Sequence, residues 1–383
     1  MALWPFCPRI EFTEALTWRS DVLQTWSAEQ RIRLTNAPRQ SLGYSHALTH
    51  RQYERAQLLM GNGGASSWDL PMWAERQRVT VSAGAGSVSV DTTASDYRAG
   101  GKALLWASDE DCELVTIDTV GASSLTLSGT TAAAYSNALI CPVRTAYCLG
   151  GLDASRRPGP IIEVQTEWTV YDGKDLADSG LYGSYRSHPL VTDCPRIGDG
   201  SFDESVAVLT MVVDNGISPP CVSAARSLAD RSLGMGWMPT TLAELWDLRC
   251  WLHSIRGRQK GFWLPSYTNG ITLAASIAPA DTTLTIRAIG LDGAAETGDL
   301  MILTTSGAQH CLRYTSVSTA GANEVLTLSA AAGITLTPAA VERICPLRFV
   351  RLVQDRVEFA HRHLGRDRQI TTVMVRAEEV PVP

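Results

Sequence analysis

The chain has 383 residues, 45% hydrophobic and 19% charged, which is typical of a folded protein with room for two or three domains. Its net charge of −6 gives no support to a surface that grips nucleic acid, because such a surface needs clustered Lys and Arg. The first residues lack a basic leader, and no window approaches 18 uninterrupted apolar residues. Neither a secretory signal nor a membrane span is therefore expected.

The nine cysteines are odd in number and show no CxxC or His/Cys ligand spacing. In a chain without an export signal, we expect them to be reduced and buried as small apolar side chains. The sequence predicts neither a metal site nor any other cofactor.

Two short stretches recur about half a chain apart. An aromatic stretch leading into Leu-Pro occurs at Trp68–Pro71 and again around Trp263 and Pro265, and Ile-Cys-Pro at Cys141 recurs at Cys345. Repeats at such a spacing indicate a duplicated architecture.

The first half begins with strand-like residues 30–48, and a helix is predicted over residues 46–62. Tyr53, Ala56, Leu58 and Leu59 are spaced like one apolar helix face, and Gly61 is placed to end the helix. Residues 78–139 then alternate Val, Leu, Ile and Thr with Gly- and Ser-rich turns. That alternation predicts a small module of short antiparallel strands.

The second half repeats this order, with strand-like residues 204–218, a helix within 239–258 and an alternating segment over 271–343. Thr241 and Glu244 form the sequence of a capping box, and Gly257 is placed to end this helix. Closing strands follow Ile-Cys-Pro in both halves, and Ser155–Pro160 has the composition of a linker.

We therefore predict a mainly β fold with two tandem barrels, each with a flanking helix and each interrupted by a small inserted β-barrel or sandwich. The first barrel comprises residues 1–75 and 142–158, with insert 1 over 76–141. The second comprises residues 159–268 and 344–383, with insert 2 over 269–343. In this interpretation Pro71, Pro265 and the prolines after Cys141 and Cys345 end strands where each insert leaves and re-enters, and the Trp residues pack those junctions.

The sequence contains no complete catalytic motif, and we expect no enzyme activity. His361 and His363 lie on the same side of one predicted strand and could bind a metal, but without a carboxylate or Cys in register they are interpreted as surface groups. The eleven Trp could instead form a sugar-binding surface, most plausibly on the inserts. Acidic residues such as Asp109–Asp111 are scattered rather than paired across a predicted cleft.

The N-terminal third and the C-terminal strands resemble a group of siphophage tail-tip proteins built on the tail-tube barrel. The motifs that carry this resemblance are Trp4-Pro5, Glu14, Leu16, Trp18, Ser20-Asp21-Val22, Glu29-Gln30-Arg31, Pro38-Arg39, Tyr44 and the closing RFVRLVQDRVEF. The resemblance covers the two barrel-like halves and not the inserts. Glu29, Arg31 and Arg39 are candidates for ion pairs between or within subunits, or else belong to a solvated strand face.

The resemblance implies a distal tail (baseplate ring) protein in the virion tail, assembled in the host cytoplasm. Such a ring joins the tail tube to the hub and the tip or fibre proteins, contacts the tape-measure protein, and lets DNA pass without specific binding. Two barrels per chain predict a homotrimer with pseudo-sixfold symmetry, with a hexamer as the alternative. The candidate assembly residues are Trp18, Asp21, Glu29, Arg31, Arg39, Trp68, Pro71, Trp263, Pro265, Cys141 and Cys345.

Two other functions remain open at this point. The chain could be the hub protein beneath such a ring. In a different class, it could be a carbohydrate-binding or cell-wall-degrading protein that uses the inserts.

Overall fold

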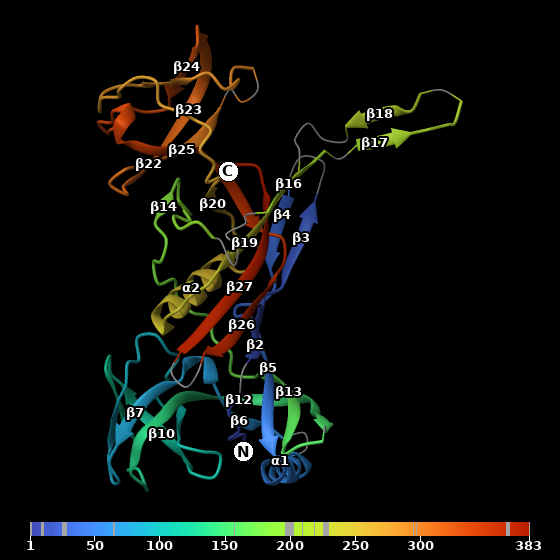
Figure 1. The fold of residues 1–383 in the computed structure, drawn as a ribbon, viewed down its shortest axis with the longest axis vertical. Coiled ribbons are helices and arrows are strands. Elements are labelled where there is room, and N and C mark those ends of the chain that lie inside the picture. Colours follow the sequence, from blue (N-terminus) through green and yellow to red (C-terminus); the bar gives the residue numbers. More distant parts are fainter. Residues whose placement is uncertain are drawn as a thin grey trace.

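The structure is a computed structural model that describes residues 2–8, 11–24, 29–63, 66–156, 158–195, 203–208, 210–217, 219–224, 230–293, 295, 297–364 and 368–382. The prediction of a mainly β fold is confirmed. The predicted barrel arrangement is not confirmed, since no sheet is closed. The strands instead form a long open sheet through the middle of the molecule, with an insert at each end (Figure 1).

The first half contains the strands β1–β6 and β12–β13, one α-helix and a short 3-10 helix. Their bounds are β1 Ala2–Leu3, β2 Glu11–Thr17, β3 Ser20–Gln24, β4 Glu29–Arg33, β5 Arg39–Thr49, α1 His50–Gly63, β6 Trp68–Pro71, η1 Trp73–Glu75, β12 Tyr135–Arg156 and β13 Ile161–Val170. Insert 1 contributes β7 Gln77–Val81, β8 Ser87–Ser89, β9 Lys102–Trp106, β10 Cys112–Val120 and β11 Ser124–Leu127.

The second half follows after two very short strands, β14 Ser184–Tyr185 and β15 His188–Pro189. Its elements are β16 Glu204–Ala207, β17 Thr210–Val213, β18 Cys221–Ala224, β19 Asp230–Trp237, α2 Leu242–Ile255, β20 Phe262–Pro265, β25 Val341–Leu352, β26 Arg356–Leu364 and β27 Arg368–Glu379. Insert 2 contributes β21 Thr283–Arg287, β22 Gly298–Thr304, β23 Gln309–Ala320, β24 Asn323–Leu328 and the 3-10 helix η2 Pro338–Ala340.

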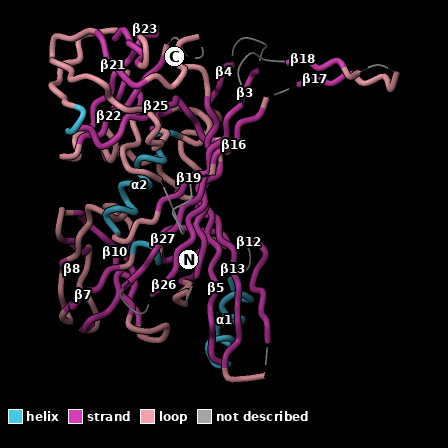
Figure 2. The backbone as a smooth tube through the Cα atoms, turned by 45° about the horizontal axis from the view of Figure 1, so that its top comes forward, coloured by secondary structure: helices cyan, strands magenta, loops and turns pink. Residues whose placement is uncertain are grey.

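The central sheet is antiparallel and runs in the order β12–β13–β5–β2–β26–β27–β19–β16. Its first four strands come from the first half and its last four from the second. The two halves therefore meet at one strand pair, β2 with β26, and do not form separate layers. Figure 2 shows the labelled strands of this sheet running together, with the two inserts on one side of them.

The strand order within the two halves is equivalent. Ser41-Leu42-Gly43 in β5 and Ser232-Leu233-Gly234 in β19 are the same tripeptide in the same place. Leu42 pairs with Trp168 of β13, and Leu233 pairs with Ala377 of β27, so these two strands correspond. The duplication inferred from the sequence echoes thus extends to strand register.

One boundary interpretation needs correction. Ser155 and Arg156 end β12, and residues 158–160 form the turn into β13; the remaining residue of the predicted linker, Arg157, lies outside the described residues. Because β13 pairs with both β5 and β12, it belongs to the sheet of the first half. The connection to the second half comes later, within residues 171–203.

The two helices begin in the same way. Thr241 accepts a hydrogen bond from the amide of Glu244, whose carboxylate accepts one in return, so the predicted capping box is present. At α1, the amide and hydroxyl of Thr49 donate to Gln52, whose amide donates back to the hydroxyl. Gly257 follows a left-handed C-cap at α2, as expected, whereas α1 continues through Gly61 to Gly63. Leu58 is exposed, so the predicted helix face holds only in part.

The inserts also share one topology. Insert 1 runs in the order β9–β10–β11–β8 and insert 2 in the order β22–β23–β24–β21. The strand at one edge of each insert sheet, β9 or β22, also pairs with a long strand. That long strand, β12 or β25, returns to the central sheet. Each insert encloses its own apolar cluster, separate from the clusters of the two halves.

The Ile-Cys-Pro prolines do not end strands as predicted. Pro142 lies inside β12, opposite Ala103 of β9, and Pro346 lies inside β25, opposite Leu300 of β22. On the opposite edge of β12, the pairing with β7 stops before the proline and the pairing with β6 starts after it. A residue without an N–H is tolerated there because that edge is changing partners.

Candidate assembly junction between the two halves

The junction between the halves is built on β2 and β26. They pair along seven residues, from Glu11 opposite Arg362 to Thr17 opposite Arg356. β2 also pairs with β5 on its other side, so it is an interior strand of the sheet. Phe12 and Leu16 are buried here.

Glu14, at the centre of β2, is fully buried and bonded from three elements. Arg249 of α2 donates from Nη2 to Glu14 Oε2 at 2.7 Å, and Gln40 of β5 donates from Nε2 to Oε1 at 2.8 Å. His361 Nε2 of β26 lies 3.2 Å from Oε2. A carboxylate of the first half is thus held by a guanidinium and an imidazole of the second half.

Arg249 joins a second carboxylate to the same network. Its Nη1 donates to Glu75 Oε1 of η1 at 2.7 Å, and both side chains are buried. Glu75 in turn accepts the amide of Asp96 of insert 1 at 2.7 Å, and the carboxylate of Asp96 pairs with Arg144 of β12 at 2.6 Å. The junction therefore ties both halves and insert 1 together through one network of ion pairs and hydrogen bonds.

The pKa values of Glu14 and Glu75 shift in opposite directions. Burial opposes ionisation of Glu14, but Arg249, His361 and Gln40 outweigh it and lower the pKa to about 2. Burial raises the pKa of Glu75 above 4.5, because Arg249 only partly offsets desolvation and Asp96 is a nearby negative charge. The surroundings therefore favour the ionised form of Glu14 and oppose that of Glu75.

His361 is the clearest departure from the sequence interpretation, since it is a buried group and not a surface one. Its ring stacks on Phe12 at 4.7 Å between centroids, and Nδ1 lies 2.8 Å from the Thr371 hydroxyl. Burial lowers the pKa of His361. A neutral imidazole satisfies both neighbours, with Nε2–H donating to Glu14 and Nδ1 accepting from Thr371. The side chain of His363 lies outside the described residues.

A second contact between the halves lies where β2 leads into the β3–β4 hairpin. The amide and hydroxyl of Ser20 donate to the carboxylate of Asp355 at 2.8 and 3.1 Å, and the amide of Trp18 donates to the carbonyl of Asp355 at 3.0 Å. Arg31 of β4 donates to the carbonyl of Arg258 at 2.8 Å. The hairpin of the first half is thus anchored on the second half.

The candidate assembly residues of the N-terminal motifs lie in different environments. Trp18 is buried in the core of the second half, edge-on to His253, and Arg31 is anchored as described. Asp21 in β3 and Arg39 in β5 are exposed. Glu29 begins β4, and its side chain lies outside the described residues. The structure brings Trp18 and Arg31 to the junction and leaves Asp21 and Arg39 on the surface.

The repeated aromatic and cysteine positions lie where the inserts join the sheet. Trp68 packs in the core of the first half, and its register equivalent is Phe262, since both open a four-residue strand ending in Pro71 or Pro265. Trp263 instead occupies the place of Asp69. It packs against Tyr185 and Phe349, whereas Asp69 pairs with Lys102 of insert 1 at 2.8 Å. At this position the first half has an ion pair to its insert, and the second half has a tryptophan that shares an apolar cluster with Met301 of insert 2.

Cys141 and Cys345 are buried at equivalent places, opposite Leu104 and Met301 of the inserts. All nine cysteines are free thiols, but they are not uniformly buried, because Cys221 is exposed. The described residues hold no group of three or more His, Cys, Asp or Glu that could bind a metal ion. No helix in the described part of the chain is long and apolar enough to cross a membrane.

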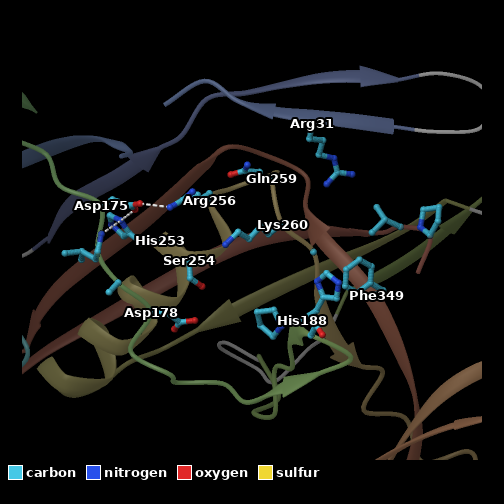
Figure 3. A pocket seen from close by; sticks show the side chains of 17 residues that line it. Arg31, Asp175, Asp178, His188, His253, Ser254, Arg256, Gln259, Lys260 and Phe349 are labelled. Carbon is cyan, nitrogen blue, oxygen red and sulfur yellow. Dashed lines mark hydrogen bonds and ion pairs between the residues drawn. The ribbon is translucent and has the colours of Figure 1, made fainter. Parts of the chain in front are cut away.

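A cavity of about 1100 Å³ lies beside the junction, between the β3–β4 hairpin and α2 (Figure 3). Two of its basic side chains contact the carboxylate of Asp175: Arg256 donates to it at 2.8 Å, and His253 Nδ1 lies 3.3 Å from it. The hydroxyl of Ser254 donates to the carbonyl of Trp251. Among the described residues that line it, no hydroxyl or thiol has a base within hydrogen-bond distance.

Glu14 and Asp355 both lie in motifs that carry the resemblance, but the sequence did not indicate either as a site residue, and Glu75 and Arg249 were missed altogether. They come from four separate stretches of the chain, and only folding brings them together. One signal was available: Glu14 in TEAL and Glu204 in DESV occupy the same place in the two halves. No known protein-family model matches the sequence, and no curated protein matches it either.

Proposed function

We propose that the chain is a structural ring component at the distal end of a long non-contractile phage tail. In this proposal each half is one tube-like barrel position, and the ring connects the tail tube to the tip complex around a lumen through which DNA passes. Three chains supply six equivalent positions. The identity as a tail-tip protein comes from the N-terminal and C-terminal motifs.

One observation supports the ring more than any other. Two halves of equivalent strand order are joined side by side in a single antiparallel sheet through β2 and β26. This contact is heterologous, because the halves use different strands, and heterologous contacts repeated around an axis close into rings. A chain that already contains one such contact needs only to repeat it between copies.

Native mass spectrometry of the purified chain, combined with negative-stain class averages, tests the proposal. We expect a trimer that forms a ring with six lobes around a hole. A hexamer would mean that each chain fills one ring position, and a monomer without a hole would remove the support for a ring. Insertion of the ring into a tail is tested by incubating it with purified tail-tube protein and imaging end-capped tubes.

A further inference from the structure

β16 is the counterpart of β2 but lacks its second neighbour. In the described part of the chain, β16 pairs only with β19, whereas β2 pairs with both β5 and β26. All four residues of β16 are exposed, and Val206 is 55% exposed where its counterpart Leu16 is 2% exposed. An open edge that carries an exposed apolar side chain is a site for pairing with another strand.

The matching open edge lies at the other end of the same sheet. Residues 152–156 of β12 pair with β13 on one side, and among the described residues they have no strand on the other. Register through β13 and β27 makes Leu152 the counterpart of Val357 and Arg156 the counterpart of His361. Asp153, Ala154, Ser155 and Arg156 are all exposed. The stretch Leu152–Arg156 therefore occupies the place that β26 occupies in the second half.

We propose that β16 of one copy pairs antiparallel with Leu152–Arg156 of the next copy, in the register of β2 with β26. This rests on the proposed ring and names the contact that closes it. Leu16 lies opposite Val357 within the chain, so Val206 lies opposite Leu152 between copies. By the same register Ser205 lies opposite Asp153, and Glu204 lies opposite Ala154.

The chemistry of the two edges is complementary. Val206 and Leu152 are both apolar and form the counterpart of the buried Leu16–Val357 pair. Glu204 takes the place of Glu14, and Arg156 takes the place of its diagonal partner His361. The buried carboxylate–imidazole contact of the chain thus becomes a carboxylate–guanidinium contact between copies.

The β17–β18 hairpin, residues 210–224, supports the same placement. Within the chain, the β3–β4 hairpin continues from β2 and is anchored on Asp355 and Arg258 of the other half. The β17–β18 hairpin continues from β16 in the same way but projects away from the body (Figure 1). Its apolar side chains are exposed: Met211, Val212, Val213, Ile217 and Val222.

The counterpart of the Asp355 turn is the bulge at Leu149–Gly151 of β12. It lies between Cys148 and Leu152, as the Asp355 turn lies between Leu352 and Val357. Leu149 there is 55% exposed, and Tyr147 beside it is also exposed. The apolar hairpin of one copy therefore has an apolar surface to cover on the next.

Cysteine pairs introduced into the full-length chain test the register. Val206→Cys with Leu152→Cys, and separately Ser205→Cys with Asp153→Cys, place thiols opposite each other across the proposed contact. Two neighbouring pairs are used because disulfides form best at only one kind of antiparallel pair. Val206→Cys with Ser155→Cys is the out-of-register control, and the single variants report background from the native cysteines. The readout is the covalent species on non-reducing gels and the mass of the native assembly.

Support requires a trimer by native mass spectrometry together with covalent dimers and trimers from an in-register pair but not from the control. A six-lobed trimer that yields no in-register crosslink would overturn this contact and leave the ring proposal intact. A monomer that yields no crosslink would overturn both. As a second readout, Val206→Asp should abolish the trimer peak without changing the thermal unfolding midpoint of the monomer, whereas Val120→Asp on insert 1 should leave the trimer intact.

Discussion

β2 and β16 occupy the same place in the two halves, yet one is among the most buried strands of the protein and the other is exposed along its length. Both carry a Glu at the same position. Glu14 is fully buried between Arg249 and His361, while the Glu204 side chain is 28% exposed and pairs with Arg231 and Arg348. The sequences of β2 and β16 are similar. The two strands therefore differ in burial because β2 has a second partner strand and β16, in the described part of the chain, does not. Burial at this position thus depends on the neighbouring strand, and in the proposed ring the same motif serves both a folded junction and an assembly edge.

Acidification should give the largest effect, because the protein buries several imidazoles in neutral form. Burial lowers the pKa of His46 and of His253 to about 4, and lowers that of His361 at the junction. The unfolded chain titrates near 6.5, so between pH 6.5 and 4 the unfolded state binds more protons. Stability is therefore complete above pH 6.5 and falls towards pH 4, by roughly 3 kcal/mol for each of His46 and His253.

Urea midpoints at pH 7.5, 6, 5 and 4 measure this dependence. The Glu14 contribution should persist to lower pH, since it is lost only as the pH falls below about 4.5 towards 2. His253→Gln should flatten the pH profile, and His50→Gln, at an exposed position, should not. A midpoint that stays constant from pH 7.5 to 4 would contradict the burial of these rings.

Removing the guanidinium from the junction should be the next largest effect. Arg249→Met leaves Glu14 and Glu75 buried without their cation, which is expected to cost about 3–5 kcal/mol. The exposed Arg356→Met should change the free energy of unfolding by less than about 0.5 kcal/mol. Denaturant unfolding of the two variants side by side tests the difference, and an equal loss in both would show that the junction is not a stabilising element.

Matched truncations at equivalent positions of β2 and β16 compare how much each side chain contributes to stability. Leu16→Ala removes a buried side chain at the junction and should cost about 2–5 kcal/mol. Val206→Ala, at the same place in β16, should change the unfolding of the dilute monomer by no more than about 0.5 kcal/mol. In the assembled protein, the same Val206 variant should weaken the trimer. Equal costs in the monomer would mean that β16 is already covered within its own chain.

The sequence predicted the parts of this architecture that local chemistry determines. The capping box at Thr241 and Glu244, the alternating strands of the inserts and the duplicated order of elements follow from neighbouring residues alone. Pro142 shows a limit of that reasoning, because proline is excluded from a strand only where its N–H is needed, and that depends on which strand lies alongside. The joined sheet could not be predicted either, since edge pairing between β2 and β26 links residues more than three hundred positions apart.

The junction residues illustrate the same limit for the site. Sequence reasoning indicated candidate ion pairs at Glu29, Arg31 and Arg39, where charged residues are close in the sequence. The buried network instead consists of isolated charges in apolar surroundings. Arg249 lies among Leu and Trp on α2, and His361 lies on an alternating strand. Such residues look like a solvated position or an ordinary core position until the opposing carboxylate is in place.

The central claim is that β16 and Leu152–Arg156 are open copies of the β2–β26 junction. Hydrogen exchange of the amides in these two segments, followed by mass spectrometry at low and high protein concentration, tests it most directly. The account predicts fast exchange in both segments in the dilute monomer and protection of both, approaching that of β2, once trimers form. Trimers in which residues 204–207 and 152–156 still exchange as fast as in the monomer would contradict it.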